Sequence, residues 1–221
     1  MAADNPFRAF LKADLWREWA RQETDQRKEI PPPPIQKPIP PDAPQVALVA
    51  PEDFTLGTMP LIEAIRRRRS RRSFTPAPLT LEELSFLLWA TQGISRTPSG
   101  EPLQRGAAVL RTVPSGGARH PFETYVAARD VTGLAAGLYR YLPLEHTLCF
   151  LQEYEAVRPR LALAARQQRM IAEAPVVFIW TVIPYRTEWR YSIVAPICIK
   201  LSTSLPDTGG YPKMSATQRY R

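Results

Sequence analysis

The chain has 221 residues, of which 44% are hydrophobic, and a formal net charge of +8. That length accommodates one domain of ordinary size with an extension, and the hydrophobic content is normal for a globular core. Its two cysteines, Cys149 and Cys198, form neither a disulfide framework nor a metal site. The N-terminus has no uninterrupted apolar h-region and no apolar run reaches about 18 residues, so neither a signal peptide nor a membrane span is indicated. We expect a soluble, cytoplasmic protein.

Two distinct segments precede the main domain. Residues 7–28 fit an amphipathic helix, because apolar side chains recur at three- and four-residue spacing. We assign residues 1–30 to an N-terminal helical extension that packs on its own domain or on a partner. Eight of the 24 prolines lie in residues 31–44. Repeated loss of amide donors favours an extended polyproline conformation, so residues 31–57 are interpreted as a semi-rigid linker.

Two helices follow the linker. Residues 58–69 begin with Thr58 as a candidate N-cap and Pro60 in the first turn, and they end in a run of arginines. The segment from Thr80 to Gly93 has a capping box and one face of leucines, and Gly93 ends it. It is the clearest helix in the sequence.

The second half of the chain has the pattern of a sheet with a covering helix. Residues 94–120 form a long Gly-, Pro- and Ser-rich loop. Three strands are then expected, at residues 122–129, 138–141 and 147–151, the last two as a hairpin. Residues 153–172 are helical in character. The continuous apolar run at 175–183 is typical of a strand covered on both faces, and we place it at the centre of the sheet. From residue 197 onward the chain has no sustained period, and an irregular tail is expected.

The arginine run from Arg66 to Arg72 allows three interpretations. It could be a nucleic-acid or polyanion patch, since such segments attract phosphate backbones without sequence demands. It could be a solvated helix end, where cations complement the helix dipole. The third uses spacing: Arg68, Ser70 and Arg72 alternate where helix gives way to extended chain, so their side chains would project to one side and could converge on a phosphate.

The segment "RTVPSGGARHPFETYV", residues 111–126, is a second candidate site. Its proline and paired glycines make an open backbone that a flat ring can approach closely. The alternative is a plain loop that leads into a strand.

Taken in order, the Arg-x-Ser-x-Arg-x-Phe run, "LTLEELSFLLWATQGI", "RTVPSGGARHPFETYV", "GLYRY" and "APVVFIWTVIPYR" resemble the nitroreductase-like flavoproteins. More narrowly they resemble the SagB-type peptide dehydrogenases, the thiazoline and oxazoline oxidases. The resemblance covers residues 60 to about 195. It implies an α/β (α+β) fold, with a nitroreductase-like sheet flanked by helices, in a domain spanning residues 58–196. It also implies an FMN-dependent oxidoreductase that acts as a homodimer with the flavin at the subunit interface.

The same resemblance assigns the cofactor-binding residues. Arg68, Ser70 and Arg72 would hold the phosphate and ribityl end of FMN. The loop would lie against the isoalloxazine ring, with Arg119 nearby. The loop residues are Pro114, Ser115, Gly116 and Gly117.

A flavin carries the hydride chemistry, so no acid/base pair is required of the protein. His120 and Tyr125 are candidates for a base, but each is better explained as a structural residue, and no catalytic residue is assigned. No metal site is expected. The substrate would be a peptide heterocycle or another small organic molecule.

The sequence departs from the family after residue 196. A long apolar helix, a Gly-rich turn and another strand are expected there, and the irregular tail at 197–221 stands in their place. A frameshift or premature stop would give this pattern, so the domain is expected to be incomplete and its activity impaired.

Two rival functions remain open. A polyanion binder would use the arginine run, although nucleic-acid binding also needs basic residues over a whole face. An adaptor could present the proline-rich segment to an SH3-like or WW-like groove. We favour the flavoprotein over both, with neither nucleic acid nor membrane as a partner.

Overall fold

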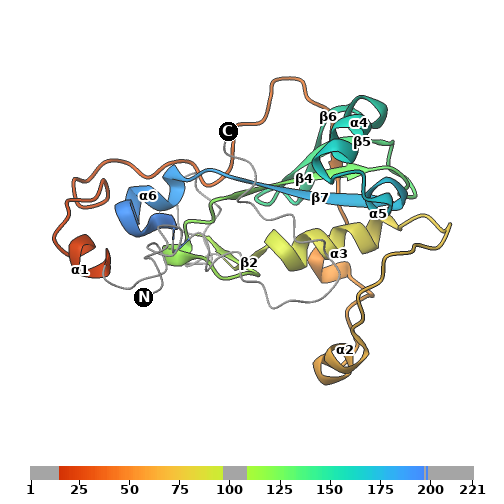
Figure 1. The fold of residues 1–221 in the computed structure, drawn as a ribbon, viewed down its shortest axis with the longest axis horizontal. Coiled ribbons are helices and arrows are strands. Elements are labelled where there is room, and N and C mark those ends of the chain that lie inside the picture. The colour runs from red at the N-terminus through yellow and green to blue at the C-terminus, as the bar shows by residue number, and fades with distance from the viewer. Residues whose placement is uncertain (1–14, 97–108, 197, 199–221) are drawn as a thin grey trace, which may run out of the picture.

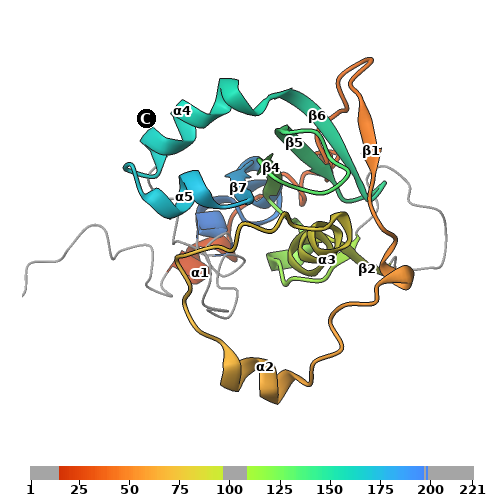
Figure 2. The same cartoon turned by 90° about the vertical axis from the view of Figure 1, so that its right-hand side faces the viewer.

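A computed structural model describes residues 15–96, 109–196 and 198 (Figure 1). Its core is a five-stranded antiparallel sheet in the order β1-β6-β5-β4-β7, with helices on both faces (Figure 2). The strands of this sheet are β1 (Gln45–Ala47), β4 (Phe122–Ala128), β5 (Gly137–Leu142), β6 (Thr147–Glu153) and β7 (Val176–Val182). The helices are α1 (Leu15–Trp19), α2 (Leu61–Arg67), α3 (Leu81–Gln92), α4 (Tyr154–Ala164), α5 (Arg169–Glu173) and α6 (Tyr185–Tyr191). The mixed fold expected from the sequence is confirmed.

Helix α3 begins and ends where its sequence predicts. The Thr80 side chain accepts a hydrogen bond from the amide of Glu83, whose side chain in turn accepts from the amide of Thr80. The helix stops at Gly93, whose amide donates to the carbonyl of Trp89. This capping box fixes the first turn, and the leucine face then packs on the sheet.

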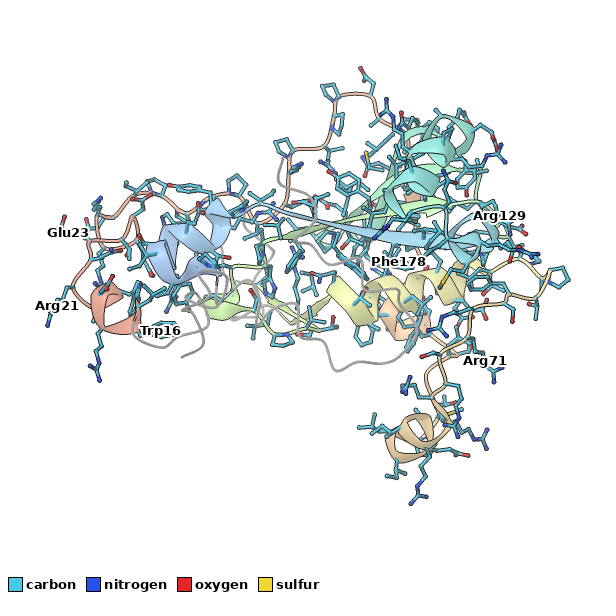
Figure 3. All side chains as sticks on the ribbon, in the orientation of Figure 1. Trp16, Arg21, Glu23, Arg71, Arg129 and Phe178 are labelled. Carbon is cyan, nitrogen blue, oxygen red and sulfur yellow. The ribbon has the colours of Figure 1, made fainter. Side chains whose placement is uncertain are left out.

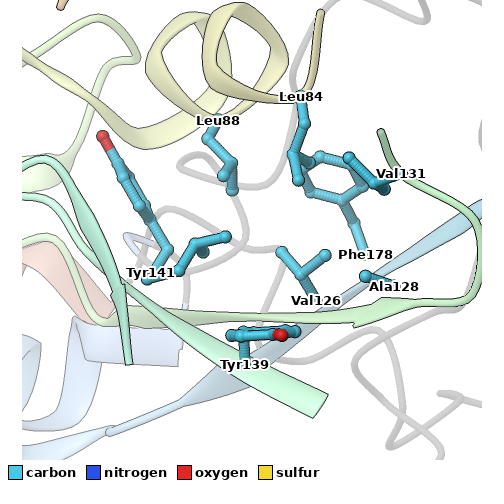
Figure 4. Packing of buried hydrophobic residues seen from close by; sticks show 9 residues of the cluster. Leu84, Leu88, Val126, Ala128, Val131, Tyr139, Tyr141 and Phe178 are labelled. Carbon is cyan, nitrogen blue, oxygen red and sulfur yellow. The ribbon is translucent and has the colours of Figure 1, made fainter. Parts of the chain in front are cut away.

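The apolar core lies between α3 and one face of the sheet. Leu84 and Leu88 of α3 are fully buried and are directed toward Val126 of β4 and Phe178 of β7 (Figure 4). A second cluster forms on the other face of the sheet, where Val177 and Ala127 pack against α4 and α5. Adjacent residues of β7 therefore face different clusters, which explains its unbroken apolar run.

The position of that strand in the sheet was predicted wrongly. Residues 175–183 were expected at the centre, whereas β7 pairs with β4 alone and forms the edge of the sheet among the described residues. Coverage of both faces produced the apolar run. That coverage does not specify how many neighbours a strand has, so the pattern could not place β7 within the sheet.

The predicted strands at 122–129, 138–141 and 147–151 are β4, β5 and β6, and the last two pair as a hairpin. The helix predicted at 153–172 is divided instead. It ends at Ala164 and resumes as α5 at Arg169, because Arg166 and Gln167 adopt positive φ angles of 53° and 58°. This turn brings α5 back along the sheet, so that Ile171 joins the second core cluster.

The predicted long loop at 94–120 contains two short strands, β2 (Ile94–Arg96) and β3 (Leu110–Arg111), which pair with each other, and the 3-10 helix η3 (Gly116–Ala118). Residues 97–108 of that loop lie outside the described part of the chain, as do the tail residues 197 and 199–221. The elements expected after residue 196 fall there too.

The N-terminal helix is shorter than the sequence suggests. The first part of the predicted helix at 7–28 lies outside the described residues, and the described part ends at Trp19. Beyond it the chain turns, and Arg27 donates hydrogen bonds to the carbonyls of Trp19, Ala20 and Gln22. The amide of Gln26 donates to the carbonyl of Trp189 at 2.9 Å. Docking on α6 has overridden the local helical preference.

We refer to residues 31–44 as the strap. The strap forms neither helix nor strand, but it bends at residues 35–36 and turns at 41–42, where Asp42 has a φ of 59°. Ile35 is only 5% exposed and packs into the domain. The residues that follow it form β1, which pairs with β6 at one edge of the sheet. The segment interpreted as a linker therefore contributes a strand to the domain.

We refer to residues 58–78 as the arm. The arm carries α2 and extends away from the sheet and the other helices in both views (Figures 1 and 2). Every residue of the arm except Glu63 is exposed. The apolar side predicted for α2 is present but uncovered, since Leu61 is 75% exposed and Ile65 is 61% exposed. The helix begins after Pro60 without a side-chain cap, so the predicted N-cap at Thr58 is wrong.

The core makes a direct prediction. Leu84→Ala should lower the free energy of unfolding by about 3 kcal/mol, because it leaves a cavity in a packed cluster. The matched control is Leu163→Ala on α4, whose side chain is 72% exposed, and it should change the stability by less than about 0.5 kcal/mol. Urea unfolding followed by circular dichroism measures both. Equal losses would contradict the core described above.

Candidate functional site

The predicted ring-binding loop is an ordered turn between β3 and β4. Pro114 is exposed, and Ser115 to Ala118 are half-buried. The Ser115 hydroxyl accepts a hydrogen bond from the amide of His120 at 2.9 Å, and the Ser115 carbonyl accepts from the amide of Ala118 at 3.1 Å. Local hydrogen bonds therefore hold the backbone of residues 115–120 in one conformation.

The paired glycines allow α6 to approach this loop. Gly117 has a φ of 59°, and a Cβ atom added there would lie 2.7 Å from Cδ of Arg190 and 2.9 Å from the hydroxyl of Tyr191. A Cβ atom at Gly116 would lie 3.1 Å from Cβ of Cys198. On the side where these Cβ atoms would lie, the turn is therefore closed by α6 and Cys198.

Arg119 is turned inward toward α6. It is 8% exposed, its Nε donates to the carbonyl of Gly117 at 3.0 Å, and its guanidinium lies 5.0 Å from the ring centroid of Trp189. Burial and the neighbouring Arg190 lower its pKa. Arg119 therefore lies between the loop and α6 and contacts both.

The three predicted phosphate-binding residues lie on the arm. Arg68 follows the last residue of α2 with φ −52° and ψ 127°, and Ser70 and Arg72 lie beyond it, outside any helix or strand. All three are exposed, and Figure 3 labels Arg71, which lies between Ser70 and Arg72 in the sequence. The helix thus ends within the arginine run, as predicted.

The two halves of the predicted site do not meet within one chain. The loop lies beside α6, at the opposite end of the fold from the arm, as the view of Figure 1 shows. The structure thus brings together Ser115 to Arg119, and separately Arg68 to Arg72, without joining the two groups.

Sequence reasoning missed a buried charged cluster behind the loop. Arg186 of α6 is 2% exposed and forms an ion pair with Glu123 of β4, which is 3% exposed. Arg111 lies nearby, donates to Gln92 at 2.9 Å, and has its pKa lowered to about 10, first by burial and then by Arg186. The available signal was Glu123 inside an otherwise apolar strand, since a charged residue there needs a partner.

His120 joins the loop to this cluster. It is 4% exposed, and no partner is found for its Nε2 atom among the described residues. Burial, followed by the charges of Arg111, Arg119 and Arg186, lowers its pKa to about 3. Its imidazole is therefore neutral at physiological pH and is a weak base.

Within the described ranges there is no group of three or more His, Cys, Asp or Glu residues that could hold a metal ion. No helix in the same part of the chain has the length and apolar character needed to cross a membrane.

Two curated proteins are similar to this chain in sequence. The protein MJ1384 of Methanocaldococcus jannaschii, assigned to the nitroreductases, is 42% identical over 119 residues, which cover 54% of each chain. The trifolitoxin-processing protein TfxB of Rhizobium leguminosarum bv. trifolii is 34% identical over 96 residues, covering 38% of this chain and 25% of that protein. The chain thus spans about half the length, or less, of these curated relatives.

The fold described above is similar to that of solved structures. A crystal structure of a nitroreductase-type protein from Ralstonia eutropha JMP134 superposes with a TM-score of 0.55 at 26% identity, covering 81% of this chain and 78% of that one. The Nitroreductase family model matches residues 65–205, a stretch that contains both the arm's arginines and the glycine loop. Because this match covers more than half of the chain, the protein belongs to the nitroreductase family.

Proposed function

We propose that this chain is an FMN-dependent oxidoreductase of the SagB type, which acts on a peptide heterocycle or another small organic substrate. The observation that carries the proposal is that one family match contains both the arginines of the arm and the loop. Similarity to a protein named for trifolitoxin processing favours the SagB branch.

The arm has the chemistry that a phosphate needs. Arg68, Ser70 and Arg72 alternate just beyond the end of α2, so in an extended conformation their side chains would project to one side. Two guanidinium groups offer paired donors to phosphate oxygens and the hydroxyl adds a short one. All three residues are exposed.

The loop has the shape that a flat ring needs. Ser115 to Gly117 present backbone without bulky side chains, and the turn is held rigid by the Ser115 and Ala118 hydrogen bonds. Because Arg190 and Tyr191 close one side of the turn, the isoalloxazine would approach from the other side.

The distance between the two halves supports a homodimer. Arm and loop lie apart in one chain (Figure 1), so a complete site would combine the arm of one copy with the loop of its partner. The uncovered apolar residues of α2, Leu61, Ile62 and Ile65, would then be buried at the interface. This arrangement explains why an apolar helix face is exposed in the single chain.

A bound FMN would supply the redox chemistry by accepting a hydride at N5 from the substrate, while a proton leaves the neighbouring carbon. The residues of this chain bind and orient the cofactor. His120 is unsuited to take that proton, because its pKa lies near 3. The Tyr125 hydroxyl accepts a hydrogen bond from Nζ of Lys37 at 3.4 Å, beneath the strap. We leave the base unassigned.

The proposal is tested by cofactor binding. Purified chain reconstituted with FMN should retain flavin absorbance after desalting. Arg72→Ala should weaken FMN binding by about tenfold or more, because a charge-assisted contact to phosphate is lost, whereas Arg66→Ala should change it little. Fluorescence titration measures both dissociation constants. Equal losses, steeply dependent on salt, would instead favour the polyanion-binding alternative.

The buried His120 makes a prediction about pH. Its pKa in the folded chain is about 3, against 6.5 for the free side chain, so the unfolded chain takes up a proton first as the pH falls. Stability present above about pH 6.5 is therefore lost below it, by roughly 2 kcal/mol between pH 6.5 and pH 5. Urea unfolding at several pH values measures this loss.

The matched variant is His120→Asn, since Asn tolerates the positive φ of 42° at this position. Its stability should fall less over the same pH range. His146, whose pKa is also lowered by burial, contributes to the slope that remains. An unchanged slope in His120→Asn would show that His120 is not held neutral by burial.

A further inference from the structure

The strap is held to the domain by arginines that donate to its carbonyl oxygens. Nε of Arg186 donates to the carbonyl of Pro34 at 2.8 Å, Nη2 of Arg111 to that of Ile35 at 3.2 Å, and Nη2 of Arg140 to that of Pro38 at 2.7 Å. Proline offers an acceptor but no donor, so the prolines of the strap can be held only by donors from elsewhere, while the Lys37 amide of the strap donates to the carboxylate of Glu123 at 3.1 Å. Buried guanidinium groups supply them here.

Arg186 differs from the other two because it also holds the loop. Its Nη1 donates to the carbonyl of His120 at 3.3 Å, and its Nη2 pairs with the carboxylate of Glu123. One side chain thus joins the strap, the end of the ring-binding loop and strand β4. The planar fork of an arginine can reach three acceptors in fixed directions, which a lysine ammonium on a flexible stem cannot do.

From these contacts we infer that Arg186 is a positioning residue for the cofactor site, and that the strap is a structural part of that site. With the strap docked, the Pro34 carbonyl and Glu123 fix the guanidinium, and the guanidinium fixes the backbone at His120. The inference rests on the proposed function in so far as the loop binds a flavin ring.

Helix α6 extends the same connection. The indole of Trp189 donates to the carbonyl of Ile30 at 2.7 Å, just before the strap, and its ring lies against Arg119 of the loop. Arg190 and Tyr191 contact the glycine turn. Strap and loop therefore both contact α6, and Arg186 is the residue of α6 that hydrogen-bonds to both.

The test compares two substitutions that keep the charge. Arg186→Lys removes the bridge between strap and loop, whereas Arg140→Lys removes a strap contact that does not involve the loop. In the flavin-free chain, amide hydrogen exchange at residues 115–120 should become about tenfold faster in Arg186→Lys and stay unchanged in Arg140→Lys. Unfolding curves confirm that both variants are folded.

The second measurement uses FMN and riboflavin, which differ in the phosphate. Arg186→Lys should weaken binding of both by the same factor, roughly tenfold, because the ring contact is affected. Arg72→Ala should weaken FMN alone. The ratio of the FMN dissociation constant to the riboflavin dissociation constant should therefore stay unchanged in Arg186→Lys and rise in Arg72→Ala. It separates damage to the ring-binding loop from loss of the phosphate site.

If Arg186→Lys does not fold, the double variant Arg186→Met with Glu123→Gln replaces it, since it leaves no buried unpaired carboxylate. Unchanged exchange at residues 115–120, or equal changes in Arg186→Lys and Arg140→Lys, would overturn the inference. If amide exchange at residues 115–120 is faster in Arg186→Lys but the unsubstituted chain binds no flavin, the positioning of the loop by Arg186 is supported and the proposed cofactor is overturned.

Discussion

The buried ion pair between Arg186 and Glu123 connects parts of the molecule that are far apart in sequence. Glu123 belongs to the central sheet, Arg186 to α6, and the Pro34 carbonyl to the strap. Two charges taken out of water are tolerated only with good geometry and further hydrogen bonds, and removal of one partner costs about 3–5 kcal/mol. The carbonyls of Pro34 in the strap and of His120 in the loop accept those further hydrogen bonds from Arg186. The positions of the strap and the loop are therefore coupled to the ion pair.

The local elements of this fold could be predicted because short-range signals agree with tertiary packing. In α3 the capping box, the leucine face and Gly93 all indicate the same helix, and the structure has all three. Strands β4 to β6 likewise carry both β-forming residues and turn signals. Where several local signals coincide, the surroundings have little reason to override them.

Long-range features were not predictable in the same way. The apolar run of β7 indicates coverage of both faces, which is correct, but the number of strands beside it depends on pairing that no local pattern encodes. The helix beyond Trp19 is replaced by turns because Gln26 is bonded to α6. For the candidate site, residue types and local spacing could be predicted, whereas the separation of arm and loop and the cluster around Arg186 required the fold.

The close approach of α6 to Gly117 changes how the glycine pair in the loop should be understood. A glycine beside a proposed flavin is naturally taken as a mark of ligand contact, but here the space that a side chain would fill is already taken by Arg190 and Tyr191. Natural selection could therefore retain this glycine for helix docking alone. A descendant that lost its cofactor would still need it, so the motif could outlast the chemistry with which it is associated.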